Sequence, residues 1–244
     1  QNDRFIIAAA VNGLGTINGG TGGTDVLDYS LFGNAIDVVL NSVVTTGFGG
    51  TEAQSSLTFD RINSIVATAQ TGDSLTGLNA GATWQVDATS GTYTSTRTLT
   101  FNGFETLTGG SLADDFTVRE TATVALNGGA GDDDITLSSG VTLTGNVVTG
   151  DDNDDVIIGV GATISGNVTL GDGVDSVQFG DSSVVTGTVT GGLGIDTIDF
   201  SAYVTGQTIE LQAANSSGGF DGRTPTIAGN ANSGFTSINS FVGS

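Results

Sequence analysis

The feature that most constrains the fold is a repeat of 21 residues in the second half of the chain. Four blocks begin at Gly128, Thr149, Leu170 and Gly191, each 21 residues after the one before. They read GGAGDDDITLSSGVTLTGNVV, TGDDNDDVIIGVGATISGNVT, LGDGVDSVQFGDSSVVTGTVT and GGLGIDTIDFSAYVTGQTIEL. A fixed period of this length indicates that each block is one structural unit and that equivalent side chains stack along an axis.

Two apolar columns recur within these blocks, two residues apart. That is the spacing of side chains on one face of a strand, and most members are β-branched or aromatic. The columns are Ile135, Val156, Val177 and Ile198, and Leu137, Ile158, Phe179 and Phe200. We expect both to point into a core.

A second strand is predicted later in each of the first three blocks. Its apolar positions are Leu143, Ile164 and Val185, followed by Val147, Val168 and Val189, with Gly145, Gly166 and Gly187 between them. Glycine is costly inside a helix, and no apolar stripe of helical period is sustained. The prediction is an all-β, right-handed parallel β-solenoid with coils of about 21 residues in the C-terminal half.

The remainder of the chain repeats more loosely. GTGGTDVLDYS at Gly20 matches GGLGIDTIDFS at Gly191, and FDRINSIVA at Phe59 aligns with FTSINSFVG at Phe235. Residues 31–108 and 203–234 do not follow the 21-residue repeat, so irregular larger coils or excursions are expected there. We expect one continuous solenoid over 1–244, most regular at 109–202, that forms part of a longer repeat array.

The charge balance limits the partners. The chain has 26 acidic residues and five basic ones, a net charge of −21, which argues against nucleic acid and anionic membranes. No apolar run is long enough to insert into a membrane. Because the chain lacks histidine and cysteine, only oxygen ligands of the kind that Ca²⁺ prefers remain for a metal.

An aspartate column supplies such ligands. Asp133, Asp154, Asp175 and Asp196 share one position of the repeat, and Asp25 and Asp114 occupy it in degenerate copies. Stacked coils place these carboxylates about 4.8 Å apart, where they repel unless a cation lies between them. We expect the column on the outer side of the coils. For a single Asp-Gly loop, a solvated turn is the alternative, and we expect solvation for Asp151, Asp152 and Asp181.

The acidic loops carry a family resemblance. GGAGDDDIT and GGLGIDTID fit the pattern GGxGxDxUx, in which U is a large apolar residue, and so resemble the hemolysin-type calcium-binding repeats of RTX proteins. Their mixture with strands such as GNVTLGDG is similar to autotransporter-like and cyanobacterial-type bacterial surface repeat proteins. The resemblance implies that aspartate carboxylates and backbone carbonyls hold Ca²⁺, and that Gly129, Gly131, Gly192 and Gly194 shape the loops.

These observations predict a calcium-stabilised structural or adhesive segment of a bacterial surface protein, extracellular and not an enzyme. Self-association end to end into a fibre, or continuation into further repeats, is expected at exposed strand edges. Surface glycans are a further candidate partner. Separately, Asn167 and Asn215 begin short patterns of the kind that accept a glycan.

Three alternatives stay open. The first is a polysaccharide-acting β-helix enzyme, although the off-repeat ionisable residues, such as Glu52, Asp73, Arg97, Glu105 and Arg223, share no motif. The second is a carbohydrate-binding surface around Trp84 and Tyr93. The third is an ice-binding face formed by a stack of Thr144, Ser165 and Thr186.

Overall fold

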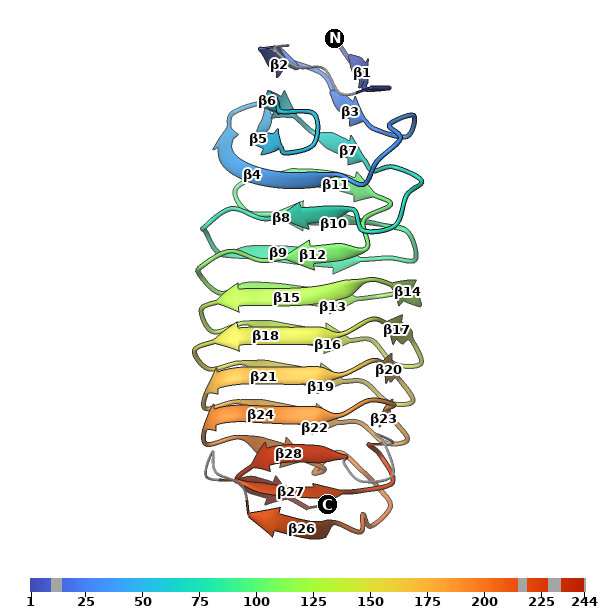
Figure 1. The fold of residues 1–244 in the computed structure, drawn as a ribbon, viewed down its shortest axis with the longest axis vertical. Helices are drawn as coiled ribbons and strands as arrows, with labels where there is room; N and C mark the ends of the chain where they lie inside the picture. The colour runs from blue at the N-terminus through green and yellow to red at the C-terminus, as the bar shows by residue number, and fades with distance from the viewer. Residues whose placement is uncertain (10–14, 215–218, 228–233, 244) are drawn as a thin grey trace.

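The chain forms stacked β-strands along one long axis (Figure 1). The computed structural model describes residues 1–9, 15–214, 219–227 and 234–243. Within these ranges there are 29 strands and no helix, and hence no helix capable of crossing a membrane. Most strand pairs are parallel, so the all-β prediction is confirmed and the architecture is consistent with a solenoid-like fold.

The strands belong to three sheets, named A, B and C here. Sheet A runs in the order β1 (Arg4–Ile6), β3 (Val26–Asp28), β7 (Ser64–Val66), β11 (Thr98–Asn102), β10 (Ser90–Thr94), β9 (Ala82–Val86), β13 (Asp114–Val118), β16 (Asp134–Leu137), β19 (Asp155–Ile158), β22 (Ser176–Phe179), β25 (Thr197–Asp199) and β29 (Ser240–Val242). Sheet B runs in the order β2 (Thr16–Asn18), β6 (Leu57–Ile62), β5 (Gly47–Glu52), β4 (Asp37–Val44), β8 (Ser74–Thr76), β12 (Thr106–Thr108), β15 (Ala125–Ala130), β18 (Val147–Asp151), β21 (Val168–Gly173), β24 (Val189–Gly194), β28 (Phe235–Ile238), β27 (Phe220–Arg223) and β26 (Glu210–Ala214). Sheet C contains β14 (Ala122–Thr123), β17 (Thr142–Thr144), β20 (Thr163–Ser165) and β23 (Val184–Val185).

The register of sheet A follows the 21-residue repeat. Ile135 pairs with Val156, Val156 with Val177, and Val177 with Ile198. These four side chains and those of the neighbouring column are buried, as the two-residue spacing predicted. The apolar ladders form the core between the sheets, and their burial is the main favourable term in folding.

The second predicted strand is in fact two strands on two sheets. The Leu143 column lies in sheet C, whereas the Val147 column lies in sheet B, so a regular coil has three sides. The chain bends between them at Gly145, which has φ +156°. A Cβ atom at Gly145 would lie 2.2 Å from the carbonyl oxygen of Val124, so the recurring glycine separates the two strands because the backbones approach closely there.

The irregular segments form antiparallel excursions, as the loss of the repeat predicted. β4, β5 and β6 pair antiparallel, as do β9, β10 and β11, and β26, β27 and β28. The second excursion holds Trp84, whose ring stacks on Phe116 at a centroid distance of 5.2 Å and meets Tyr93 edge-on at 4.5 Å. Both Trp84 and Tyr93 are completely buried, so neither offers a carbohydrate-binding surface.

A column of glycines lies near the ends of the sheet B strands, next to the corner that carries the repeated aspartates. Gly129, Gly150, Gly171 and Gly192 pair in register along four coils. Gly171 has φ +110°, and a Cβ there would lie 1.7 Å from the carbonyl oxygen of Gly150. The coils therefore stack at this spacing only because the column has no side chains.

Replacing one member of this column should destabilise the fold. We expect Gly171→Ala to lower the free energy of unfolding by about 1–3 kcal/mol, because the residue is held in a conformation that L side chains avoid. Gly206→Ala is the matched control, since nothing lies within 4 Å of its added Cβ. Urea unfolding followed by circular dichroism measures both. Equal stability of the two variants would contradict the close-approach explanation.

Candidate functional site: the aspartate corner

The repeated aspartates lie at the corner where the chain passes from sheet B to sheet A. Asp133, for example, lies between β15 and β16. All six predicted aspartates are 1% exposed or less, so the column is inside the molecule and the expectation of an outer column is wrong. The reason is strand alternation: Ile135 and Leu137 point inward from β16, and Asp133, one residue before this strand, has the same parity.

One hydrogen bond repeats along the column. The backbone N–H of each aspartate donates to the carboxylate Oδ1 of the equivalent aspartate one coil further on. The donor–acceptor distances are 2.7 Å for Asp114 to Asp133, 2.8 Å for Asp133 to Asp154, 2.9 Å for Asp154 to Asp175, and 3.3 Å for Asp175 to Asp196. We call this series the aspartate ladder.

Asparagines continue the same interaction. The N–H of Asp196 donates to Asn239 Oδ1 at 3.0 Å, which ends the ladder. Near the N-terminus a second, shorter series links the Asp3 N–H to Asp25 Oδ1 at 2.9 Å and the Asp25 N–H to Asn63 Oδ1 at 3.0 Å. We did not predict Asn63 and Asn239 as site residues, although the shared INS of the two duplicated segments marks both.

The second carboxylate oxygen has no such partner. Oδ2 of Asp133, Asp154, Asp175 and Asp196 is buried without a hydrogen bond among the described residues. In Asp114, Oδ2 accepts the Gly110 N–H at 2.7 Å and Oδ1 is the atom without a partner. A buried carboxylate oxygen that receives no hydrogen bond requires a proton or a cation.

Glycines leave room for oxygen atoms beside these carboxylates. A Cβ at Gly128 would lie 2.2 Å from Asp133 Oδ2 and 2.5 Å from the carbonyl oxygen of Thr149. A Cβ at Gly191 would likewise lie 2.4 Å from Asp196 Oδ2 and 2.3 Å from the carbonyl oxygen of Ser237. A carboxylate oxygen and a backbone carbonyl of the next coil thus crowd the same glycine, which is a donor set of the type that hard cations take.

Burial shifts the proton affinity of the column. Burial, and after it the charges of neighbouring aspartates, raises the pKa of Asp133 and of Asp175 to about 7, despite an opposing backbone hydrogen bond to each. Burial also raises the pKa of Asp114 to about 6, and it raises the pKa of Asp154 and Asp196. Near neutral pH the ladder therefore contains carboxylates that are poised between a bound proton and a negative charge.

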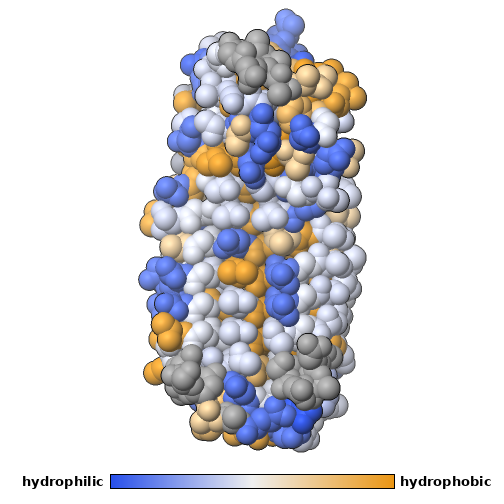
Figure 2. All heavy atoms as spheres, viewed as in Figure 1, coloured by the Kyte–Doolittle hydropathy of each residue, from blue (hydrophilic) through white to orange (hydrophobic). Residues whose placement is uncertain are grey.

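A second acidic column lies on the outside of the same corner. Asp115 pairs with Asp134 and Asp134 with Asp155, and all three side chains are exposed. Asp151, the last residue of β18, and Asp152 directly after it are exposed, as predicted, and Asp181 is half-buried. Strongly hydrophilic residues gather along the edge of the molecule where β15, β18 and β21 end (Figure 2). The corner is thus acidic on both its inner and its outer side.

The loop glycines of the predicted metal site have a structural role of their own. Gly129, Gly131, Gly192 and Gly194 all have positive φ, between +106° and +126°. Asp152 occupies the position equivalent to Gly131 and also has positive φ, at 81°. Within the described ranges no three acidic side chains converge on one point. The corner instead presents one buried carboxylate per coil, surrounded by backbone.

The other residues singled out from the sequence fall into separate places. Glu52 and Asp73 are both buried. Glu52 accepts the backbone N–H of Ser55, and Asp73 accepts that of Ile36, so each carboxylate satisfies a backbone group inside the fold. The hydroxyl stack lies on sheet C, where Thr144 pairs with Ser165 and both are exposed.

Two further sequence candidates concern surface glycans. Asn167 is exposed, and its Oδ1 accepts the Thr188 N–H at 3.0 Å. Asn215 lies outside the described residues. Glycan attachment and the ice-binding face remain predictions.

Comparison with known proteins gives no assignment: no protein-family model matches the chain, and no curated protein or solved structure is detectably similar to it.

Substitutions at Asp154 separate the hydrogen bond from the charge. We expect Asp154→Asn to retain most of the stability, because an amide oxygen accepts the same bond at Asn63 and Asn239. Asp154→Ala leaves the buried Asp133 N–H without an acceptor, at a cost of about 1–3 kcal/mol. Urea unfolding of the two variants measures the difference. Similar losses in both would show that the ladder bond does not determine stability.

The pKa shifts also predict how stability depends on pH when no divalent cation is present. The folded chain holds protons up to about pH 7 at Asp133 and Asp175, whereas an ordinary aspartate has a pKa of 3.8. The contribution of these groups to the free energy of unfolding is therefore fully present below pH 3.8 and is lost as the pH rises through 7.

Urea unfolding in the presence of chelator, repeated across this pH range, measures how steeply the free energy of unfolding falls as the pH rises. Asp133→Asn with Asp175→Asn should flatten this slope, because the variant has no carboxyl group to titrate at these positions. An unchanged slope in the double variant would contradict the assignment to the ladder.

Proposed function

We propose that the chain is a calcium-stabilised structural or adhesive segment of a bacterial surface protein, and that it acts outside the cell as a continuous right-handed parallel β-solenoid. The observation that carries this proposal is the aspartate ladder, with one buried, unpartnered carboxylate oxygen in each regular coil. The resemblance of GGAGDDDIT and GGLGIDTID to RTX repeats supports the choice of cation.

The residues present fit a hard cation in the type of donor they supply. Asp114, Asp133, Asp154, Asp175 and Asp196 would provide carboxylate oxygens, and the glycine loops beside them would provide backbone carbonyls. Asp25 would do the same in the first part of the chain. Bound Ca²⁺ would supply positive charge next to the buried carboxylates. Each carboxylate also accepts an N–H from the coil before it, so an ion on that carboxylate would strengthen the connection between successive coils.

The chemistry of the ladder favours a mechanical role over catalysis. Its acids are identical from coil to coil, lie in the interior and are committed to backbone N–H groups, whereas a catalytic group must reach a substrate. Folding that requires Ca²⁺ would be delayed until the chain reaches a calcium-rich compartment. Strands β1 and β29 lie at opposite ends of sheet A, so further repeats or other copies would add at such edges to extend the rod.

Calcium should stabilise the chain through the ladder. At neutral pH, each site filled at a free Ca²⁺ concentration of 100 times its Kd adds about 2.7 kcal/mol to the free energy of unfolding. Calcium titration of the chelated protein, followed by circular dichroism and thermal unfolding, measures this gain. The double variant Asp154→Asn with Asp175→Asn should stay folded, but calcium should stabilise it less, because two of the ladder carboxylates are absent.

The matched control removes the same charge elsewhere. Glu120→Gln with Asp181→Asn changes two acids outside the ladder and should respond to calcium as the unaltered chain does. A chain that calcium does not stabilise, or equal responses of the two double variants, would contradict a calcium site at the ladder.

A further inference from the structure

Sheet C begins abruptly at β14. The regular coils connect sheet A to sheet B through a strand of sheet C; between the end of β16 and the start of β18, residues 138–146 include β17. One coil earlier the connection between β13 and β15 is shorter but includes β14. Between β11 and β12 only residues 103–105 remain, and they form no strand. The position above β14 therefore lacks the strand that the repeat would place there (Figure 1).

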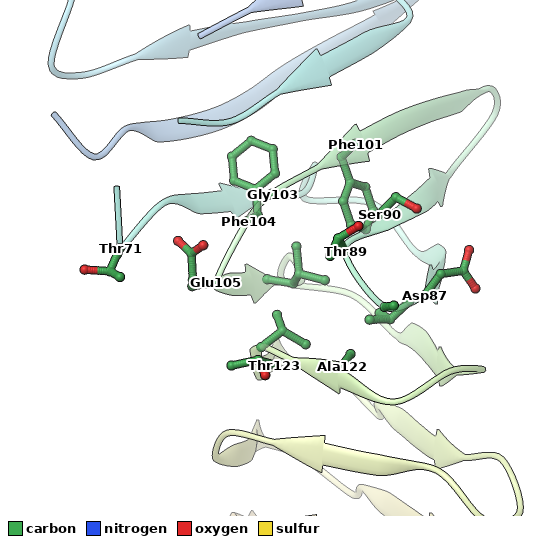
Figure 3. A pocket seen from close by; sticks show the side chains of 14 residues that line it. Thr71, Asp87, Thr89, Ser90, Phe101, Gly103, Phe104, Glu105, Ala122 and Thr123 are labelled. Atoms are coloured by element: carbon green, nitrogen blue, oxygen red, sulfur yellow. The ribbon is translucent and has the colours of Figure 1, made fainter. Parts of the chain in front are cut away.

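A cavity of about 370 Å³ occupies this position. Ala122, Thr123 and Val124 form one wall, and Phe101, Phe104 and Leu107 contribute apolar surface on the others. Figure 3 shows the two aromatic residues on one side of the space and Ala122 and Thr123 on the other. The apolar wall is therefore adjacent to a strand edge.

The edge of β14 that faces away from β17 pairs with no strand of the described residues. The Val124 N–H donates to the Thr144 carbonyl at 3.0 Å, and β17 is the one partner of β14 in sheet C. In a parallel ladder the backbone groups of successive residues alternate between the two neighbouring strands. The N–H and C=O of Thr123 therefore point away from β17, toward the cavity.

The opposite end of sheet C shows what such an edge accepts. β23 is followed by a parallel bridge between Val185 and Ile227, and the Val185 N–H donates to the Thr226 carbonyl at 3.0 Å. The Ile227 side chain is 2% exposed and continues the inward column of Leu143, Ile164 and Val185. At the β14 end the column begins with Ala122, the smallest side chain in it. Ala122 is 4% exposed, but no strand of the described chain pairs with β14 on the cavity side as Ile227 pairs with Val185.

We infer that the cavity above β14 is a docking slot for an extended peptide of a partner protein, which adds one parallel strand to sheet C and places a large aliphatic side chain over Ala122. Glu105 lines the rim together with Asp87, which is ion-paired with Arg119 at 2.7 Å. The chain as a whole carries a net charge of −21, so the peptide would have basic residues beside the aliphatic one. This is recognition by strand addition, in which backbone hydrogen bonds provide affinity and one pocket provides specificity. The inference does not depend on calcium binding.

The test uses the acetylated and amidated peptide Lys-Thr-Ile-Thr-Lys, with Lys-Thr-Asp-Thr-Lys as the control peptide. We expect saturable binding of the first peptide by calorimetry, weaker at high salt, with slower amide hydrogen exchange at Thr123. Two variants should each reduce the affinity at least tenfold. Ala122→Leu fills the slot with the residue that stands at Leu143, and Thr123→Pro removes the edge N–H, which an edge strand tolerates.

Thr163→Ala, on the outer face of the same sheet, is the matched variant that should bind normally. Circular dichroism establishes that each variant is folded, and either slot variant alone suffices for the test. Absence of binding, or equal affinity of the folded slot variants and Thr163→Ala, would overturn the inference. Self-association of the chain that Ala122→Leu abolishes, without peptide binding, would assign the slot to a second copy and would also overturn it.

Discussion

The structure depends on one interaction that repeats at one corner of the coil, the hydrogen bond from the N–H of a buried aspartate to the carboxylate of the next one. Apolar ladders supply most of the favourable free energy, but apolar contacts have no direction, and a shift of two residues would keep the same face of a strand inward. The ladder bond requires one acceptor at one place in every coil. It therefore fixes the register at the corner where sheet B turns into sheet A.

This way of fixing the register places negative charge in the interior. Each carboxylate uses Oδ1 for the ladder and retains an oxygen with no partner, in a column where the next carboxylate is one coil away. Asparagine at Asn63 and Asn239 forms the same bond without a charge. The regular coils nevertheless carry aspartate throughout. Hydrogen bonding alone does not account for that choice, whereas a neutralising proton or cation does.

Much of the architecture could be predicted from the sequence, because a period of 21 residues determines which side chains stack. The Ile135 and Leu137 columns follow directly from it, and so does the row of aspartates. The three-sided coil could not be predicted with the same ease, since Leu143 and Val147 are apolar residues on either side of a short glycine turn. The strand pairing places them in different sheets, and the close approach of Gly145 to Val124 marks the bend between them.

The inward orientation of the aspartates was also missed, for an instructive reason. Charge suggested a solvated face, although Asp133, one residue before β16, has the same parity as Ile135 and points the same way. The cavity above β14 had no sequence signal at all, because it arises from a strand that the irregular coil before it leaves out.

The state of the ladder carboxylates tests the account most directly, and ¹³C NMR of the aspartate Cγ atoms measures it. In chelator, the Cγ resonances of Asp133 and Asp175 should titrate near pH 7, the value to which burial raises their pKa. With saturating calcium the same resonances should report ionised carboxylates to well below that midpoint. Resonances that titrate at the same pH with and without calcium would show that the cation does not bind the ladder, and would contradict the central claim.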